Sequence, residues 1–376
     1  MRSRTDLDIR VFYLWDFGVR RTHDPGFGKD IAWDTDLLSG YDSEFVPNTA
    51  RHPGAEHFFG FKNPEVIRRL ESWKPDALLL FGYKWATHLR VAFWARTKGI
   101  PLIFRGDSHL IGRERVPPAM RLALGLIFKQ FSAFLHVGAA NKEYFRAFGV
   151  PESKLFFAPH SVDASLFDPS LPAHRAATEM LKSQLGLQPE SRIVLYAGKL
   201  VDAKQPLELL EAFGSLNPKG AALVFVGDGE LLGRLQSRAK ELSTAAGAAP
   251  VRFLPFANQS EMPSRYLLAE VFVLPSKGLY ETWGLAVNEA MHMGIPCLVS
   301  TRVGCQRDLV IDNETGWVFD PLGGDNLKLT LARALSDVSS PDRRAALRAE
   351  VERRVSRYTY AATTRGLRDA LEFIQR

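Results

Sequence analysis

The stretch from residue 271 to residue 300 constrains the fold of this chain more than any other. A short apolar run at 271–274 predicts a buried strand, and a second run at 297–300 predicts another. Between them Thr282 can cap a helix that Gly294 would end. A strand, a loop, a helix and a second strand in this order form a βαβ unit, and such a unit implies a parallel sheet.

The start of this helix predicts an anion site. The backbone N–H groups of Trp283, Gly284 and Leu285 would have no partners within the helix, so they favour a phosphate or diphosphate. Gly284 would let such a ligand approach the backbone closely. Glu281 and Glu289 suit hydroxyl groups of a sugar or ribose better than a phosphate. A structural loop followed by a helix with a solvated glutamate is the alternative that these residues leave open.

The residue pattern of this stretch resembles the donor-site signature of glycosyltransferase family 4 (group 1). The pattern is Pro-Ser-x-x-x-x-Glu-Thr-Trp-Gly-Leu-x-x-x-Glu-Ala-Met, with Glu281 and Glu289 as the two glutamates. The resemblance to the family continues at 303–304, 308–310 and 315–319. In that family the first glutamate faces the donor sugar and the second faces the nucleotide ribose. The resemblance implies a retaining glycosyltransferase with the GT-B fold.

The length of the chain and its pattern indicate two domains. The 376 residues are enough for two domains of ordinary size, and a proline-rich segment at 169–172 interrupts the alternation of strands and helices. We predict an α/β protein of GT-B type, with two doubly wound Rossmann-like domains facing across a cleft. The predicted ranges are 1–165 for an acceptor-binding domain, 166–355 for a nucleotide-sugar-binding domain and 356–376 for a helix that crosses back to the first domain.

Composition narrows the partners and the location. The net charge of +6 is mildly basic and suits anionic substrates or membranes, but no nucleic-acid motif is present, so we expect no nucleic acid partner. Cys297 and Cys305 form neither a disulfide framework nor a metal cluster, and a reducing cytoplasm fits them. Residues 1–10 lack the apolar core of a signal peptide, so we expect none. Polar residues interrupt the apolar stretch at 122–140, which makes it a poor candidate for a transmembrane helix.

Basic and apolar residues share the segment at 113–134, which we expect to be helical. A basic amphipathic helix can lie on an anionic membrane, so peripheral contact with the inner face of a membrane is one interpretation. An ordinary surface helix that packs on the sheet is the other, and it is slightly favoured.

In the first domain, the loop after the strand at 101–104 carries the candidate catalytic residues. Arg105 and His109 lie in this loop, and sheets of this kind bind ligands at the carboxyl ends of their strands. The resemblance implies that a histidine in this region touches the donor sugar. His109, Arg105 and Glu281 are therefore the candidate catalytic residues, with a surface histidine as the alternative for His109.

In the second domain, basic residues follow the strand at 192–197. Gly198, Lys199 and Lys204 match the family pattern Gly-Arg-x-x-x-x-Lys, whose two basic side chains bind the donor diphosphate. Lys199 keeps the charge of the arginine but not its planar fork, and two surface lysines are the alternative. Phe256 ends a further strand and is expected near the nucleotide base. The predicted donor site comprises Gly198, Lys199, Lys204, Phe256, Thr282, Trp283, Gly284, Leu285 and Glu289.

We expect neither a metal nor a resident cofactor. Residues 34–36 spell Asp-Thr-Asp, which holds a divalent metal in another class of glycosyltransferase. They precede no donor-site pattern, so a turn or helix start is the favoured interpretation. Lys199, Lys204 and the helix amides would supply the positive charge that a departing diphosphate requires.

The predicted function is transfer of a sugar from a nucleotide-diphosphate sugar to a glycan, glycolipid or other envelope-type acceptor, as in polysaccharide biosynthesis. Retention at the anomeric carbon is implied by the family resemblance. Two alternatives remain open at this point. One is an epimerase or phosphorylase that uses the same fold, and the other is a non-catalytic protein that binds nucleotide sugars.

Overall fold

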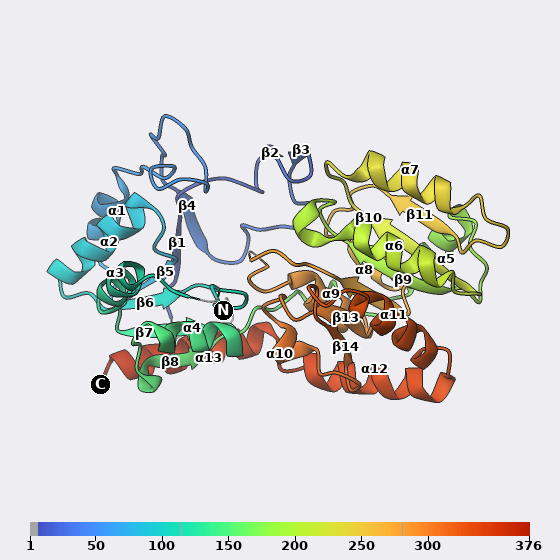
Figure 1. Cartoon of the computed structure of the whole chain (residues 1–376). Coiled ribbons are helices and arrows are strands. Elements are labelled where there is room, and N and C mark those ends of the chain that lie inside the picture. The colour runs from blue at the N-terminus through green and yellow to red at the C-terminus, as the bar shows by residue number, and fades with distance from the viewer. Residues whose placement is uncertain (1–6, 114, 280) are drawn as a thin grey trace. The chain divides into compact units, whose positions relative to one another are not determined.

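The computed structural model describes residues 7–113, 115–279 and 281–376, and it divides the chain into two compact units (Figure 1). Unit 1 contains residues up to Thr22, residues 31–159 and residues 361–376. Unit 2 contains residues 23–30 and 160–360.

These limits differ from the ranges predicted from the sequence. The first division falls at 159/160 instead of 165/166, and the last segment rejoins unit 1 at Ala361 instead of residue 356. The larger correction is the segment 23–30, which the prediction placed in the first domain. It groups with unit 2, and its side chains also pair with residues of that unit.

A four-stranded parallel sheet forms the centre of unit 1. Its strands are β5 (Leu78–Phe81), β6 (Leu102–Arg105), β7 (Ala133–His136) and β8 (Leu155–Phe157), which pair in this order. The helices between them are α2 (Ala86–Thr97), α3 (Pro118–Phe128) and α4 (Ala139–Ala147), with α1 (Val66–Trp73) ahead of β5 and the 3-10 turn Glu152–Lys154 ahead of β8. A separate parallel pair joins β1 (Arg10–Tyr13) to β4 (Asp42–Phe45).

Aromatic side chains fill the core on one face of this sheet. Phe104, Phe128, Phe134 and Phe145 are buried, and their ring centroids lie 5.2 to 5.7 Å apart, mostly in edge-to-face or tilted pairs. Such arrangements are the favoured ones for aromatic pairs. The helix α3 contributes Phe128 to this core, and it is shorter than the predicted 113–134 because Pro117 and Pro118 define its start.

The last helix, α13 (Tyr360–Ile374), covers the other face. Leu367 and Ala370 pack with Ile103 and Leu135 in a second cluster. The helix approaches the sheet so closely that a Cβ atom on Gly366 would lie 2.0 Å from the carbonyl oxygen of Phe157. Only glycine fits at that position, and this contact ties the end of the chain to unit 1.

Unit 2 contains a six-stranded sheet in which all strands are parallel. The strands are β9 (Arg192–Ala197), β10 (Ala221–Val226), β11 (Val251–Leu254), β12 (Val271–Leu274), β13 (Cys297–Ser300) and β14 (Gly316–Phe319), paired in the order β11-β10-β9-β12-β13-β14. The α-helices are α5 (Pro172–Gln184), α6 (Pro206–Leu216), α7 (Leu232–Leu242), α8 (Met262–Tyr266), α9 (Leu285–His292), α10 (Gln306–Leu309), α11 (Asn326–Asp337) and α12 (Pro341–Val355).

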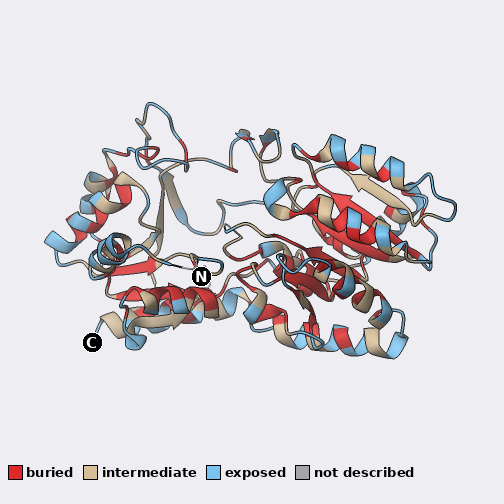
Figure 2. Ribbon diagram, viewed as in Figure 1, coloured by how far each residue is buried: buried red, intermediate tan, exposed pale blue. Residues whose placement is uncertain are grey.

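This strand order is that of a doubly wound nucleotide-binding sheet, in which the winding direction reverses between β9 and β12. The strands β9, β10, β12 and β13 are buried along almost their whole length, while the helices around them bury one side and expose the other (Figure 2). Continuous apolar runs are what strands covered on both faces require. Ligands of such sheets bind at the carboxyl ends of the strands beside the reversal point.

The helix after β12 starts later than predicted. Gly284, not Thr282, is the residue that precedes the first residue of α9, and its φ is +91°. A Cβ atom on Gly284 would also lie 2.8 Å from Val303 Cγ1 and 3.0 Å from Leu274 Cδ2. Gly284 is therefore required by backbone conformation and by packing within the protein, whereas the prediction gave it a role in letting the ligand approach.

Candidate functional site

The loops after β9 and β12 bring two predicted site residues together at the reversal point. Lys204 ends the 3-10 turn Asp202–Lys204, and its Nζ lies 2.7 Å from Glu281 Oε2. Ser276 Oγ donates to the same carboxylate oxygen at 2.9 Å. Both members of the ion pair are mostly shielded, with 25% and 16% of their side chains exposed. The predicted diphosphate lysine and the predicted sugar-facing glutamate therefore share one place.

Lys199 follows β9 directly, but its ammonium group has a different partner. Gly198 holds the backbone in register through its N–H, which donates to Val226 O at 3.0 Å. The Lys199 ammonium lies 2.8 and 3.0 Å from the two carboxylate oxygens of Asp24. Tyr196 Oη, buried beneath, donates to Lys199 O at 2.7 Å and fixes the backbone there. Lys199 is therefore held in place at both its backbone and its side chain.

Glu289 lies on α9 and pairs with a buried tyrosine. Tyr266 of α8 donates its hydroxyl proton to Glu289 Oε2 at 2.7 Å. Burial raises the pKa of Glu289 to about 7, and the hydrogen bond from Tyr266 acts in the opposite direction. A carboxyl group with such a pKa changes its charge near neutral pH, and perturbed groups of this kind mark candidate functional sites.

Trp283 has a structural position that the sequence did not indicate. Its side chain is 4% exposed, and its Nε1 donates to Asn288 Oδ1 at 2.7 Å. Asn288 in turn donates to His160 O at 3.1 Å, and the Trp283 ring lies 5.7 Å from the ring of His160. Because Trp283 lies before the first residue of α9, the amides of the first helical turn are those from Leu285 onward.

Phe256 lies two residues beyond the end of β11, whereas the prediction made it the last residue of that strand, and it has close neighbours in unit 2. Its backbone N–H donates to Asp228 Oδ2 at 3.1 Å. Its ring meets the ring of Phe27 edge-on, with 4.8 Å between centroids, and Lys29 Nζ lies 5.4 Å from its centre.

The two candidate residues in unit 1 have structural partners of their own. Arg105 donates to Ala158 O at 2.7 Å and to Pro159 O at 3.4 Å, so its guanidinium joins the end of β6 to the segment after β8. Burial lowers the pKa of Arg105, and the charge of Asp107 opposes that shift. The side chain remains a cation under any ordinary condition.

His109 is buried, with 4% of its surface exposed, so the surface interpretation is wrong. Its Nδ1 accepts a hydrogen bond from the Ile111 N–H at 3.1 Å. Because Nδ1 accepts, the neutral ring carries its proton on Nε2. Asn141 steadies the same loop by donating to Ser108 O at 2.8 Å.

The Asp-Thr-Asp segment forms a turn. Asp36 Oδ1 accepts the N–H groups of Leu38 and Ser39 at 3.1 and 3.0 Å, which is the pattern of an Asx turn. Among the residues that the structure describes, no group of three or more His, Cys, Asp or Glu side chains is arranged to hold a metal ion.

The sequence reasoning missed several partners in unit 2. Asp24, Lys29, Ser276 and Tyr266 contact predicted site residues, and Lys29 pairs with Asp228. Ser276 belongs to the signature that contains Glu281, so its hydroxyl could have been predicted as a partner of that glutamate. The others had no motif, because their roles depend on contacts between distant parts of the chain.

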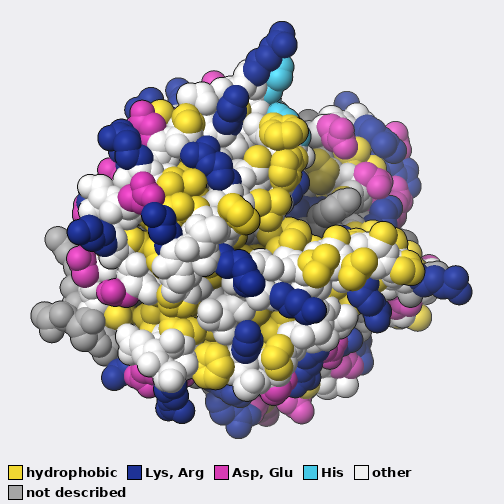
Figure 3. All heavy atoms as spheres, turned by 90° about the vertical axis from the view of Figure 1, so that its left-hand side faces the viewer, with side chains coloured by type: hydrophobic (Ala, Val, Ile, Leu, Met, Phe, Trp, Pro, Cys, Tyr) yellow, Lys and Arg dark blue, Asp and Glu magenta, His cyan; other side chains and the backbone are white. Residues whose placement is uncertain are grey.

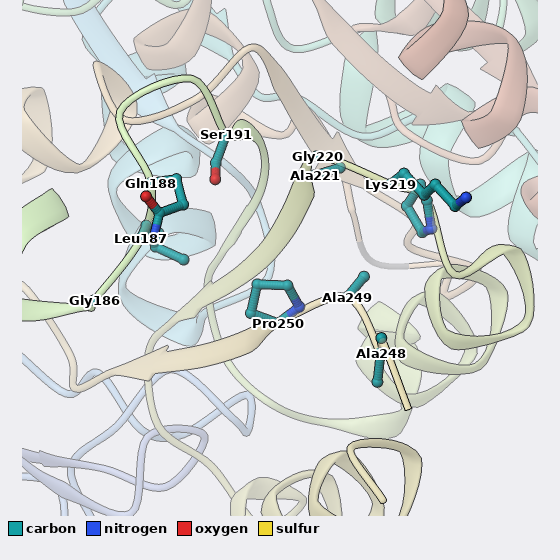
Figure 4. A pocket seen from close by; sticks show the side chains of 12 residues that line it. Gly186, Leu187, Gln188, Ser191, Lys219, Gly220, Ala221, Ala248, Ala249 and Pro250 are labelled. Atoms are coloured by element: carbon teal, nitrogen blue, oxygen red, sulfur yellow. The ribbon is translucent and has the colours of Figure 1, made fainter. Parts of the chain in front are cut away.

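A hollow of about 300 Å³ lies elsewhere in unit 2 (Figure 4). Ser191, Gly220 and Pro250 line it, and they directly precede β9, β10 and β11. It is thus at the amino ends of the strands, whereas Lys199, Lys204 and Glu281 follow carboxyl ends. The candidate site of unit 2 is the cluster at the carboxyl ends.

Comparison with known proteins agrees with this geometry. Residues 178–353 match the family model described as "Glycosyl transferases group 1". The matched residues lie within unit 2, and the match confirms the resemblance to group 1 glycosyltransferases found in the sequence. The fold of the chain is GT-B.

Two relatives and one solved structure illustrate which proteins this chain is similar to. A D-inositol 3-phosphate glycosyltransferase of Xylanimonas cellulosilytica is 30% identical over 179 residues, which cover 46% of this chain and 41% of that protein. A GDP-mannose-dependent alpha-(1-6)-phosphatidylinositol monomannoside mannosyltransferase of Mycobacterium tuberculosis is 28% identical and matches 82% of this chain and 78% of its own length. The structure of Anabaena Alr3699/HepE with UDP and glucose superposes with a TM-score of 0.66 at 18% identity, covering 89% and 86% of the two chains.

Proposed function

We propose that this protein transfers a sugar from a nucleotide-diphosphate sugar to a glycan or lipid-linked acceptor, with retention at the anomeric carbon. The observation that carries the proposal is the meeting of Lys204 and Glu281 at the reversal point of a group 1 glycosyltransferase domain. The similarity to a protein solved with UDP and glucose supports a nucleotide sugar as donor.

The chemistry of the site is stabilisation of a leaving group. When the glycosidic bond to the diphosphate breaks, negative charge grows on the departing phosphate oxygen. Lys204 and Lys199 offer fixed positive charge, and the first turn of α9 offers backbone amides and a helix dipole. We propose that these groups bind the diphosphate without a metal or a resident cofactor.

The two glutamates take different parts in this proposal. Glu281 accepts hydrogen bonds from hydroxyl groups of the donor sugar, and its ion pair with Lys204, the proposed diphosphate ligand, supports this role. Glu289 accepts hydrogen bonds from the ribose hydroxyls, and Tyr266 orients its carboxyl group. In unit 1, His109 touches the donor sugar or the acceptor in this proposal, and Arg105 holds the end of the strand from which its loop starts.

The acceptor is proposed from the relatives and from the surface of unit 1. The names of two relatives specify an inositol phosphate and an inositol lipid glycoside as their substrates. Large apolar side chains are exposed on unit 1, among them Phe59, Phe93 and Leu122, and Figure 3 shows hydrophobic side chains lying between lysines and arginines on one face. Such a surface supports peripheral contact with an anionic membrane at the cytoplasmic side. No helix within the described residues is long and apolar enough to cross a bilayer.

The test is binding followed by turnover. A thermal-shift screen of UDP, GDP and ADP should identify the base, and isothermal titration should measure its affinity. The matching nucleotide sugar should then be hydrolysed slowly in water and consumed faster with inositol phosphate or a glycolipid acceptor. Binding without any turnover would favour a nucleotide-sugar-binding protein, and no binding by any nucleotide would reject the proposal.

A further inference from the structure

The segment 23–30 belongs to unit 2, although the residues on both sides of it belong to unit 1. It contains most of the short paired strands β2 (Thr22–Asp24) and β3 (Lys29–Ile31) and the turn between them. Three of its side chains attach it to unit 2: Asp24 pairs with Lys199, Lys29 pairs with Asp228, and Phe27 packs on Phe256. We call residues 23–30 the docked segment.

The carboxylate of Asp24 pairs with Lys199, the lysine that is proposed to bind the donor diphosphate. Its two carboxylate oxygens lie 2.8 and 3.0 Å from Lys199 Nζ. Oδ1 also accepts the N–H groups of Gly26 and Phe27 at 2.8 and 3.2 Å, so the carboxylate is held in one orientation. Burial acts to raise the pKa of Asp24, but Lys199 and these two amides hold it below its ordinary value. The group is therefore an anion at neutral pH.

Phe27 packs its ring against Phe256, the residue expected from the sequence to lie near the nucleotide base. Its ring meets Phe256 at 4.8 Å, and Lys199 Nζ lies 5.1 Å from its own centre. The approach to Lys199 is close, because a Cβ atom on Gly26 would lie 2.5 Å from Lys199 Cδ. The docked segment thus joins a carboxylate and an aromatic ring that contact the same side chains as a phosphate and a base would.

We propose that the docked segment is a built-in competitor for the nucleotide donor. Asp24 takes the place of a phosphate on Lys199, Phe27 takes the place of the base against Phe256, and a nucleoside diphosphate displaces both. The inference rests on the proposed function. The opposite arrangement, in which the segment closes over the bound donor and adds contacts to it, predicts the opposite sign for each measurement below.

The first measurement is titration of UDP, GDP and inorganic pyrophosphate into the wild type, Asp24→Asn and Asp30→Asn. Asp24→Asn removes the competing charge, so it should bind the preferred nucleoside diphosphate and pyrophosphate about threefold to tenfold more tightly. Asp30→Asn is the matched control, because it removes the same charge from the same segment. Asp30 is exposed and contacts His23, 3.3 Å away, so this variant should bind like the wild type.

The second measurement needs no variant. Hydrogen exchange of the Gly26 and Phe27 amides, which donate to Asp24, should become faster when the nucleoside diphosphate is added to the wild type. Slower exchange on binding, or unchanged or weaker nucleotide affinity in Asp24→Asn, would overturn the inference while the proposed function stands. If the wild type binds no nucleotide, the proposed function and this inference fail together.

Discussion

The carboxyl end of β6 in unit 1 and the carboxyl ends of β9 and β12 in unit 2 carry similar kinds of side chain, but they use them differently. After β6, Arg105 donates to backbone carbonyls and His109 accepts from a nearby amide. After β9 and β12, Lys204 and Glu281 meet each other from two different strands. Charged groups that converge from separate strands form a site more clearly than charged groups that satisfy the backbone around them.

The largest expected effect tests the converging pair. Lys204→Ala removes a fixed positive charge beside the departing phosphate and removes the lysine of the ion pair with Glu281. We expect the transfer rate to fall roughly hundredfold, because loss of one preorganised stabilising group typically costs about that much. Affinity for the nucleoside diphosphate should fall about tenfold.

Steady-state kinetics and isothermal titration measure these two effects. Lys219→Ala is the matched control, since Lys219 precedes β10 at the opposite end of the sheet and lines the hollow there. Unchanged donor affinity in Lys204→Ala would remove Lys204 from the diphosphate site.

The second prediction could break the contrast between the two strand ends. If His109 donates to the sugar or the acceptor through Nε2, His109→Ala should lower kcat about tenfold or more. Nucleoside diphosphate affinity should stay the same, because Lys199, Lys204 and Glu289 belong to unit 2.

The melting temperature must accompany this measurement, because His109 is buried. A lower kcat with a normal melting temperature would make the loop after β6 part of the site. A near-normal kcat would assign His109 to the fold alone.

A smaller effect is expected at Glu289. Glu289→Gln keeps the shape of the side chain and loses charge-assisted acceptance from two ribose hydroxyls. Nucleoside diphosphate affinity should weaken about threefold to tenfold, and pyrophosphate affinity should not change. Equal losses for both ligands would refute the ribose assignment.

Glu289 also predicts a pH dependence. Its folded pKa of about 7 lies above the ordinary value of 4.5, so the folded state holds this proton over a range in which the unfolded state has lost it. The stability contributed by Glu289 should be present below pH 4.5 and lost as pH rises toward 7. The melting temperature of the wild type relative to Glu289→Gln should therefore be higher at pH 5 than at pH 8, and a constant difference would contradict the raised pKa.

The smallest expected effect is that of chelation. Because lysines and helix amides are proposed to stabilise the diphosphate, treatment with EDTA should leave the transfer rate unchanged. Loss of activity that Mg²⁺ or Mn²⁺ restores would reject the metal-independent mechanism, and the turn at Asp36 would need to be tested again.

Part of this protein could be predicted from the order of its residues. The buried strands of unit 2 are continuous apolar runs, and the length of these runs and the turn residues around them suffice to find them. The roles proposed for Lys204, Glu281 and Glu289 came from two motifs that follow predictable strands. Lys204 and Glu281 lie in the connections after β9 and β12, and Glu289 lies on α9. The parallel sheet followed from the same alternation of strands and helices, since parallel strands need a crossover between them.

Only the tertiary structure decided the rest. Trp283 is buried and holds Asn288 by a hydrogen bond. The residue before α9 is Gly284 instead of Thr282, because the packing of Gly284 against Val303 and Leu274 sets that turn. Asp24 meets Lys199 across 175 positions of the chain, and no local pattern carries that information. Local sequence specifies which backbone conformation a segment prefers, but which distant side chain neutralises a charge is decided only when the folded chain brings the two together.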